Sequence, residues 1–107
     1  MPAFDVKETP EGFVFRADMP GIKTEDLDVK VADNRLTISG KREEEKKGQQ
    51  DTYYTYERSY GSFTRSFMLP EGVDTDKVHA DLKDGVFSLM LPRKPGKAPK
   101  QVKVEKS

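Results

Sequence analysis

Apolar and polar side chains alternate with a period of two along several short runs of this sequence. In residues 27–31, the apolar members are Leu27, Val29 and Val31. Similar alternation runs through residues 13–18, 35–39 and 62–69. Because successive side chains of a β-strand point to opposite faces, this pattern predicts strands that are buried on one face. Residues 86–91 are apolar on both faces, which predicts a central strand.

Turn-forming residues separate these runs at short intervals. Pro10-Glu11-Gly12 suits a hairpin turn, and so do Asp33-Asn34 and Asp84-Gly85. Many short strands joined by local turns predict an all-β sandwich. Residues 76–82 also fit helical spacing, but seven residues are few for a helix, so we predict a strand there.

The composition favours one domain with a thin core. Of the 107 residues, 34% are hydrophobic and 36% are charged, so apolar side chains are scarce for a globular protein. A core of this size is marginally stable by itself, and self-association would bury the additional apolar surface. We therefore expect a small β-sandwich that binds copies of itself.

Charge and cysteine content argue against several classes of partner. Lys and Arg number 19, as do Asp and Glu, whereas nucleic-acid binding relies on a basic excess. No apolar run approaches the roughly 20 residues that span a bilayer. We therefore expect a soluble protein without a nucleic-acid or membrane partner. The chain has no cysteine, which fits the reducing cytoplasm.

Residues suited to catalysis are not gathered in a recognisable motif. His79 is the single histidine, and the alternation directs its side chain away from Val78 and Leu82, toward solvent. The glycines are dispersed rather than clustered in a phosphate-binding loop, and no cysteine can act as a nucleophile or a metal ligand. We expect no enzymatic activity, no cofactor, no metal and no small-molecule substrate.

Two segments differ from the strands. Residues 41–61 form a long connection that begins with charged and amide side chains and later carries Tyr53, Tyr54 and Tyr56. Connections of this length within a domain are typically functional or disordered. Residues 93–107 mix proline with lysine and include the sequence Val102-Lys103-Val104. This composition predicts a flexible, partly extended tail with one apolar spot near its end.

Two of the alternating strands have two interpretations. The first strand carries Leu27, Val29 and Val31, and the second carries Val78, Ala80 and Leu82. If both lie at a sheet edge, these side chains form a shallow groove. If they do not, they are ordinary core residues, and the residues alone favour that simpler interpretation.

Several motifs resemble those of one family. Residues 80–87, Ala-Asp-Leu-Lys-Asp-Gly-Val-Phe, resemble the signature of the small heat-shock proteins, also called the alpha-crystallin family. In that signature an alanine is followed by polar residues and then by Gly-Val-Leu, so Phe87 replaces the usual leucine. Stretches that resemble bacterial and plant-type members follow in the family's order at residues 2–8, 17–21, 26–29, 34–42 and 61–70.

The resemblance implies a fold and a dimer. The fold is an immunoglobulin-like β-sandwich, the alpha-crystallin domain, over residues 1–92. Residues 41–61 would be a dimerisation loop whose residues 52–57 form a strand exchanged with the partner. Residues 4–7 would be the edge strand that receives it. The expected dimer contacts are Phe4, Val6, Tyr53, Tyr54, Tyr56 and Arg65.

Arg65 needs a separate explanation, because it shares the inward face of Phe63 and Phe67. A buried arginine requires a carboxylate partner or a place at an interface. The resembling arginine of the family stabilises dimers and larger assemblies, so we expect Arg65 to do the same.

The resemblance also changes the interpretation of the groove. The family's C-terminal anchor is a pair of β-branched residues separated by one residue, a form that Val102 and Val104 match. The anchor would bind the groove formed by residues 27–31 and 78–82, and a vacated groove would accept a client. On the tripeptide alone, an incidental pair of valines in a basic tail remains equally acceptable.

The function that the resemblance implies is ATP-independent binding of partly unfolded proteins, which prevents their aggregation. Family members normally have an N-terminal arm of tens of residues, and this sequence lacks most of it, so we expect dimers or small oligomers with weakened activity. The alternative is a co-chaperone module of related fold that docks onto an ATP-driven chaperone. A catalytic β-sandwich acting on carbohydrate is less favoured, because no aromatic platform or rigid carboxylate pair is evident.

Overall fold

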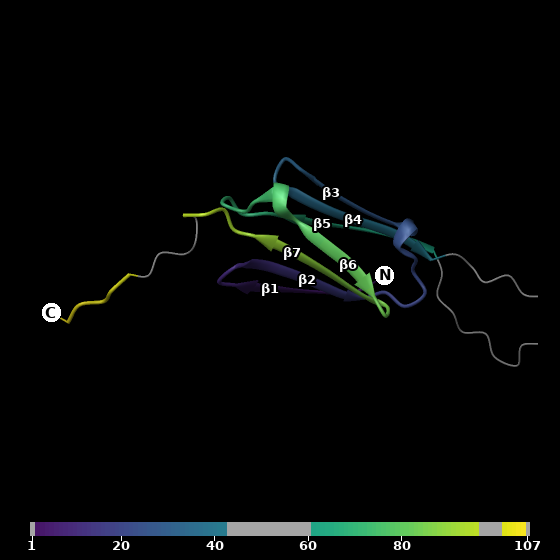
Figure 1. Ribbon diagram of the computed structural model, residues 1–107, viewed down its shortest axis with the longest axis horizontal. Helices are drawn as coiled ribbons and strands as arrows, with labels where there is room; N and C mark the ends of the chain where they lie inside the picture. The colour runs from purple at the N-terminus through teal and green to yellow at the C-terminus, as the bar shows by residue number, and fades with distance from the viewer. Residues whose placement is uncertain (1, 43–60, 97–101, 107) are drawn as a thin grey trace, which may run out of the picture.

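The computed structural model describes residues 2–42, 61–96 and 102–106. In this part of the chain, seven strands and two short 3₁₀ turns form a sandwich of two antiparallel sheets (Figure 1). The elements are β1 (Phe4–Thr9), β2 (Gly12–Asp18), η1 (Thr24–Asp26), β3 (Leu27–Ala32), β4 (Arg35–Arg42), β5 (Gly61–Met68), η2 (Thr75–Lys77), β6 (His79–Lys83) and β7 (Val86–Pro92). One sheet has the order β1-β2-β7-β6 and the other has the order β3-β4-β5. The predicted all-β sandwich is confirmed.

The hairpin turns lie where the turn residues predict them. Asp33 and Asn34 have φ angles of 52° and 60° between β3 and β4. Asp84 and Gly85 have φ angles of 52° and 78° between β6 and β7. Two consecutive residues with positive φ form the turn type whose twist matches that of the flanking strands. These turns set the registers that follow.

The core lies between the two sheets and is built from alternating residues. Strand β7 occupies an inner position between β2 and β6, as its apolar character predicts, and every second one of its side chains is buried. The buried apolar residues are Phe15, Ala17, Met19, Leu36, Ile38, Phe63, Leu69, Val73, Phe87, Leu89 and Leu91. Burial of each large side chain contributes about 1.5–3 kcal/mol, so this cluster supplies the main stabilisation of the sandwich.

The prediction of one strand over residues 76–82 is partly wrong. The structure has the 3₁₀ turn η2 at Thr75–Lys77, and β6 begins only at His79. The cause is Asp74, whose carboxylate accepts a hydrogen bond from the backbone N–H of Asp76 at 3.1 Å. Asp side chains that bond to a nearby N–H compete with strand pairing in this way. Val78 therefore precedes the strand instead of belonging to it.

Some predictions concern residues that the structure does not describe. Tyr53, Tyr54 and Tyr56 lie outside the described residues, and so does the strand predicted at residues 52–57. The described residues include no helix long and apolar enough to cross a membrane.

Candidate functional site

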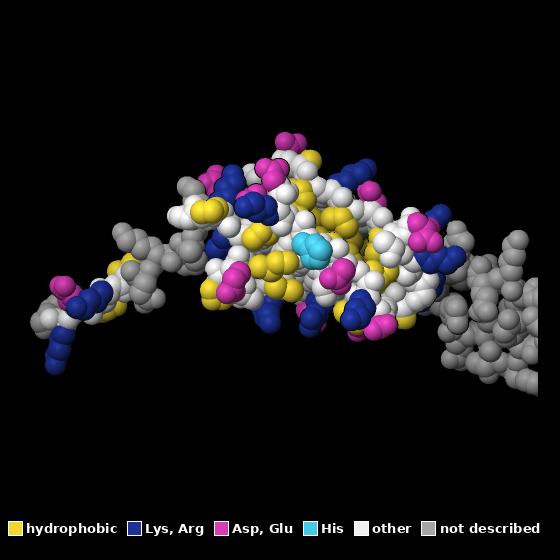
Figure 2. All heavy atoms as spheres, in the orientation of Figure 1, with side chains coloured by type: hydrophobic (Ala, Val, Ile, Leu, Met, Phe, Trp, Pro, Cys, Tyr) yellow, Lys and Arg dark blue, Asp and Glu magenta, His cyan; other side chains and the backbone are white. Residues whose placement is uncertain are grey.

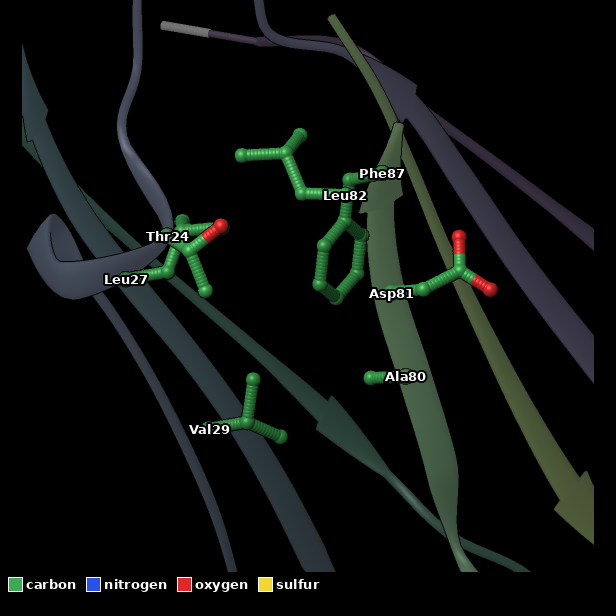
Figure 3. A pocket seen from close by; sticks show the side chains of 7 residues that line it. All are labelled: Thr24, Leu27, Val29, Ala80, Asp81, Leu82 and Phe87. Carbon is green, nitrogen blue, oxygen red and sulfur yellow. The ribbon is translucent and has the colours of Figure 1, made fainter. Parts of the chain in front are cut away.

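An apolar groove opens between β3 of one sheet and β6 of the other (Figure 3). The residues that line it are Thr24, Leu27, Val29, Ala80, Asp81, Leu82 and Phe87. Figure 2 shows hydrophobic side chains reaching the surface along the seam between the two layers. The cavity volume is about 160 Å³, below the roughly 300 Å³ at which pockets for small molecules begin. The groove is therefore suited to the side chains of an extended peptide rather than to an enclosed ligand.

Strand alternation explains why the two walls of the groove are apolar. On β3, Leu27 and Val29 point toward β6, whereas their neighbours Asp28 and Lys30 are exposed. On β6, Ala80 and Leu82 point toward β3, and the carboxylate of Asp81 points away from the cavity (Figure 3). Each strand thus presents one apolar row to the groove and one polar row to solvent.

Gly40 makes room for one wall of the groove. It lies opposite Leu27 in the register of β3 and β4. A Cβ atom at this position would lie 2.9 Å from Cδ2 of Leu27 and 2.8 Å from the ring of Phe63. Both distances are shorter than van der Waals contact, so the absence of a side chain lets Leu27 settle between the core and the groove.

The structure brings together four of the six residues predicted for the groove. Leu27, Val29, Ala80 and Leu82 line the cavity, whereas Val31 and Val78 are half-buried and pack against the core. Prediction from sequence missed Thr24, Asp81 and Phe87. The sequence could have indicated Phe87, because it pairs with Leu82 across the β6–β7 hairpin. Nothing in the sequence indicates Thr24, since η1 reaches the groove only through the tertiary fold.

The tail carries two exposed valines. Val102 is 70% exposed and Val104 is 91% exposed, although β-branched apolar residues are usually buried. Both therefore offer apolar surface to another part of the molecule or to a second copy.

Strand β1 lies at the edge of the four-stranded sheet and was predicted to receive the exchanged strand. Val6, in its middle, is 48% exposed. Phe4 instead packs within its own sandwich, where its ring contacts those of Phe67 and Phe87 edge-to-face at centroid distances of 5.4 and 6.3 Å. The exposed apolar surface of this edge therefore comes mainly from Val6.

Arg65 contacts two aromatic rings, a kind of partner that the sequence did not indicate. Its guanidinium carbon lies 5.4 Å from the ring centroid of Phe4 and 5.3 Å from that of Phe67. Within residues 2–42, 61–96 and 102–106, no carboxylate forms an ion pair with it. Cation–π contacts of this kind stabilise a half-buried arginine, and here they join β5 to the edge strand β1.

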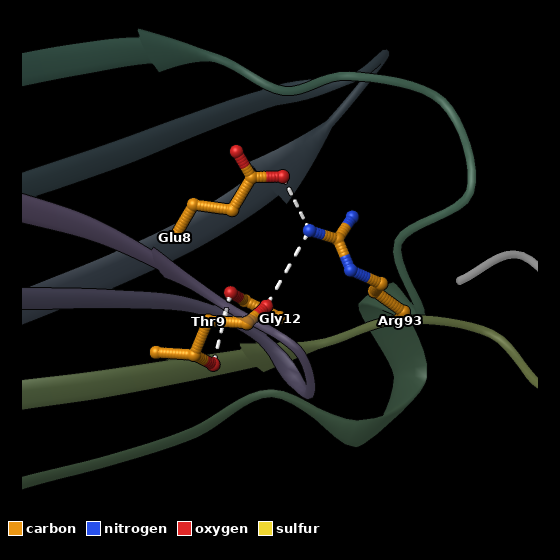
Figure 4. Close-up of polar contacts among 4 residues, drawn as sticks. All are labelled: Glu8, Thr9, Gly12 and Arg93. Carbon is orange, nitrogen blue, oxygen red and sulfur yellow. Dashed lines mark hydrogen bonds and ion pairs between the residues drawn. The ribbon is translucent and has the colours of Figure 1, made fainter. Parts of the chain in front are cut away.

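A cluster of polar contacts, which the sequence did not predict, joins the start of the tail to the β1–β2 hairpin (Figure 4). One terminal nitrogen of Arg93 donates to the carboxylate of Glu8 and, at 3.5 Å, to the backbone carbonyl of Thr9. The guanidinium also lies 5.2 Å from the ring centroid of Phe13. The backbone N–H groups of Arg93 and Lys94 donate to the carbonyls of Glu11 and Gly72. The chain is thus held to the sandwich through Lys94.

Comparison with known proteins places the chain in a family. Residues 5–105 match the Hsp20/alpha crystallin family. The chain belongs to this family. As an alpha-crystallin domain, it is 50% identical to spore protein SP21 of Stigmatella aurantiaca over 107 residues, which are all of this chain and 63% of that protein. It is 46% identical over 96 residues to a 17.5 kDa class I heat shock protein of Glycine max, with 89% of this chain and 62% of that protein covered.

Solved structures of small heat-shock proteins share the fold of this alpha-crystallin domain. A small heat-shock protein from Xylella fastidiosa, described as having a distinct high order structure, superposes with a TM-score of 0.80 at 37% identity, covering 99% of this chain and 97% of that one. Heat shock protein 16.0 from Schizosaccharomyces pombe has a TM-score of 0.81 at 29% identity and covers 97% of both chains. The chain spans less than two thirds of the length of spore protein SP21 and of the Glycine max protein.

Proposed function

We propose that this chain acts as an ATP-independent chaperone of the cytoplasm, which binds partly unfolded proteins and limits their aggregation. The observation that carries the proposal is the open apolar groove between β3 and β6, together with a tail that exposes two valines. The groove binds either the tail of another copy or an extended apolar segment of an unfolded client. The proposed activity is binding, without catalysis, cofactor or nucleotide.

The energetics favour a weak and exchangeable contact between tail and groove. Burial of Val102 and Val104 contributes roughly 3–6 kcal/mol. Association costs roughly 4–15 kcal/mol in lost translational and rotational freedom. A single tail therefore binds weakly, while several tails on linked subunits hold an assembly together. A groove that a tail vacates becomes available to a client.

The proposed homodimer uses the opposite side of the sandwich. Strand β1 leaves an edge that no other described strand pairs with, and Val6 is exposed there. Such an edge pairs readily with an added strand. We assign this role to residues 52–57 of the partner, with Tyr53, Tyr54 and Tyr56 as contacts. Arg65 and Phe4 act on the same interface indirectly, because their mutual contact holds β1 in place.

The alternative of a co-chaperone module is not favoured. The family match and the similar solved structures are small heat-shock proteins, and a docking module would require neither the groove nor the tail valines.

Suppression of aggregation tests the proposal. A heat-labile client enzyme is warmed without ATP, alone or with the chain, while light scattering is followed. The parent should lower the scattering. Ala80→Arg should suppress it less, because an arginine at this exposed groove position fills the cavity between β3 and β6.

The matched control is His79→Arg, which adds the same side chain one residue away. The side chain of His79 is 80% exposed and lies on the other face of β6. This variant should protect the client as well as the parent does. A parent that leaves scattering unchanged at several-fold molar excess would falsify the chaperone function, and equal protection by both variants would remove the groove from it.

A further inference from the structure

The free edge of β6 determines how a tail lies in the groove. Strand β6 is the last strand of its sheet, and β7 is its only strand partner within the described residues. Its other side borders the groove. An extended peptide added there as a strand places alternate side chains on opposite faces. If Val102 and Val104 enter the groove beside Ala80 and Leu82, then Lys103 must lie on the solvent face.

Lys103 then lies beside Asp81, whichever way the tail runs. Asp81 is the residue between Ala80 and Leu82, just as Lys103 is the residue between the two valines. Reversing the direction of the tail exchanges the valines but leaves the central pair unchanged. Lys103 therefore faces Asp81 in a parallel and in an antiparallel arrangement alike.

The residues paired with Asp81 across the sheet do not neutralise its charge, so a cation can bind beside it at the free edge of β6. On the outer face of the sheet, the strand registers align one residue from each strand in a row: Asp5, Arg16, Ser88 and Asp81. Arg16 is two strands from Asp81, at about 9–10 Å from the ordinary strand spacing. The neighbour directly opposite Asp81 is Ser88, which is uncharged, and the next place in the row belongs to the added strand.

The carboxylate of Asp81 is accessible to a basic side chain on the added strand. Its side chain is 58% exposed and points away from the apolar cavity. Among the described residues, Nε2 of His79 lies 4.0 Å from its carboxylate, a contact that is an ion pair only when the histidine is protonated. Lys83 lies two residues farther along the same face of β6.

We propose that Asp81 selects the central residue of the docked segment, so that the groove prefers the Val-Lys-Val tail of a second copy of this chain. This inference rests on the proposed docking of the tail in the groove. The two valines supply the attraction that any apolar pair would give, and the Asp81–Lys103 pair adds specificity. Opposite charges placed across neighbouring strands attract, whereas like charges repel.

A charge-swap experiment tests the selection. The acceptor is the full chain carrying Val102→Ala/Val104→Ala, so that its own tail competes little. The probe is a fluorescent peptide of residues 97–107, whose affinity is measured by polarisation. The substitution Asp81→Asn removes the negative charge and should weaken peptide binding about 1.4- to 5-fold, which corresponds to the contribution of one cross-strand ion pair. Lys103→Glu in the peptide should weaken it further, by roughly 2- to 25-fold, because repulsion replaces attraction.

The combination of changes gives the decisive result. The Lys103→Glu peptide should recover affinity on the Asp81→Lys acceptor. The control peptide Lys106→Glu has the same net charge and should not show this recovery. One outcome would overturn the selection by Asp81 but leave tail docking intact. In it, the parent peptide binds and Ala80→Arg blocks this binding, but the charge swap restores no affinity. A parent peptide that does not bind would overturn both.

Discussion

Removal of the Arg93 side chain should destabilise the sandwich more than loss of a surface ion pair would. Arg93 is only 12% exposed, although it follows the last strand of the domain. Its guanidinium contacts the carboxylate of Glu8, the carbonyl of Thr9 and the ring of Phe13. Arg93→Ala removes all three contacts and also the aliphatic stem that covers the β1–β2 hairpin.

The expected loss in the free energy of unfolding is the sum of the contributions of these contacts. The Glu8 side chain is 60% exposed, so the ion pair contributes only about 0.2–1 kcal/mol. The cation–π contact with Phe13 contributes about 0.5–1 kcal/mol, and the buried stem contributes about as much as one methylene, roughly 0.8 kcal/mol. Together with the long hydrogen bond to Thr9, Arg93→Ala should lower the free energy of unfolding by about 1.5–3 kcal/mol. The melting temperature should fall by roughly 6–15 °C.

Urea unfolding followed by circular dichroism measures this loss, with all variants at one protein concentration because self-association contributes to stability. The matched variant Glu8→Gln removes only the ion pair and should cost under about 1 kcal/mol. Arg93→Lys keeps the charge and most of the stem, so it should fall between the two. Two results would refute the reasoning: a loss below about 0.5 kcal/mol for Arg93→Ala, or an equal loss for Glu8→Gln.

Two further substitutions test the packing beside the groove and the edge strand. Gly40→Ala should destabilise the chain by about 1–3 kcal/mol in urea unfolding, because its new Cβ overlaps the ring of Phe63; an unchanged midpoint would contradict this packing. Arg65→Gly removes the contacts with Phe4 and Phe67 that hold β1 in place, so it should raise the dimer dissociation constant and increase aggregation. A dissociation constant equal to that of the parent would count against the role of Arg65.

The local pattern of the sequence predicts most of the fold because alternation and turns depend on neighbouring residues. The turn at Asp33-Asn34 and the central strand Val86–Pro92 are examples. The error at residues 76–82 is also local, but its cause is the carboxylate of Asp74 rather than any apolar spacing. A pattern of apolar residues alone does not record such a hydrogen bond.

The candidate site is less predictable because its parts come from distant positions. Alternation suggested the apolar rows of β3 and β6, but only the packing of the two sheets places Leu27 near Leu82. The contact between Arg93 and Glu8 spans 85 residues, and no periodicity indicates it. Arg65 is a further example, because its inward position alone does not indicate the rings of Phe4 and Phe67, which only tertiary packing brings to its guanidinium.

The docking of the tail in the groove is tested most directly by molar mass, measured with multi-angle light scattering during size exclusion. The parent is predicted to elute as dimers or larger species. Val102→Ala/Val104→Ala should give a smaller mass or a narrower distribution, because it removes the apolar side chains that enter the groove. Equal masses and distributions for the two proteins would contradict tail docking, and monomers in both would also contradict the strand-exchanged dimer.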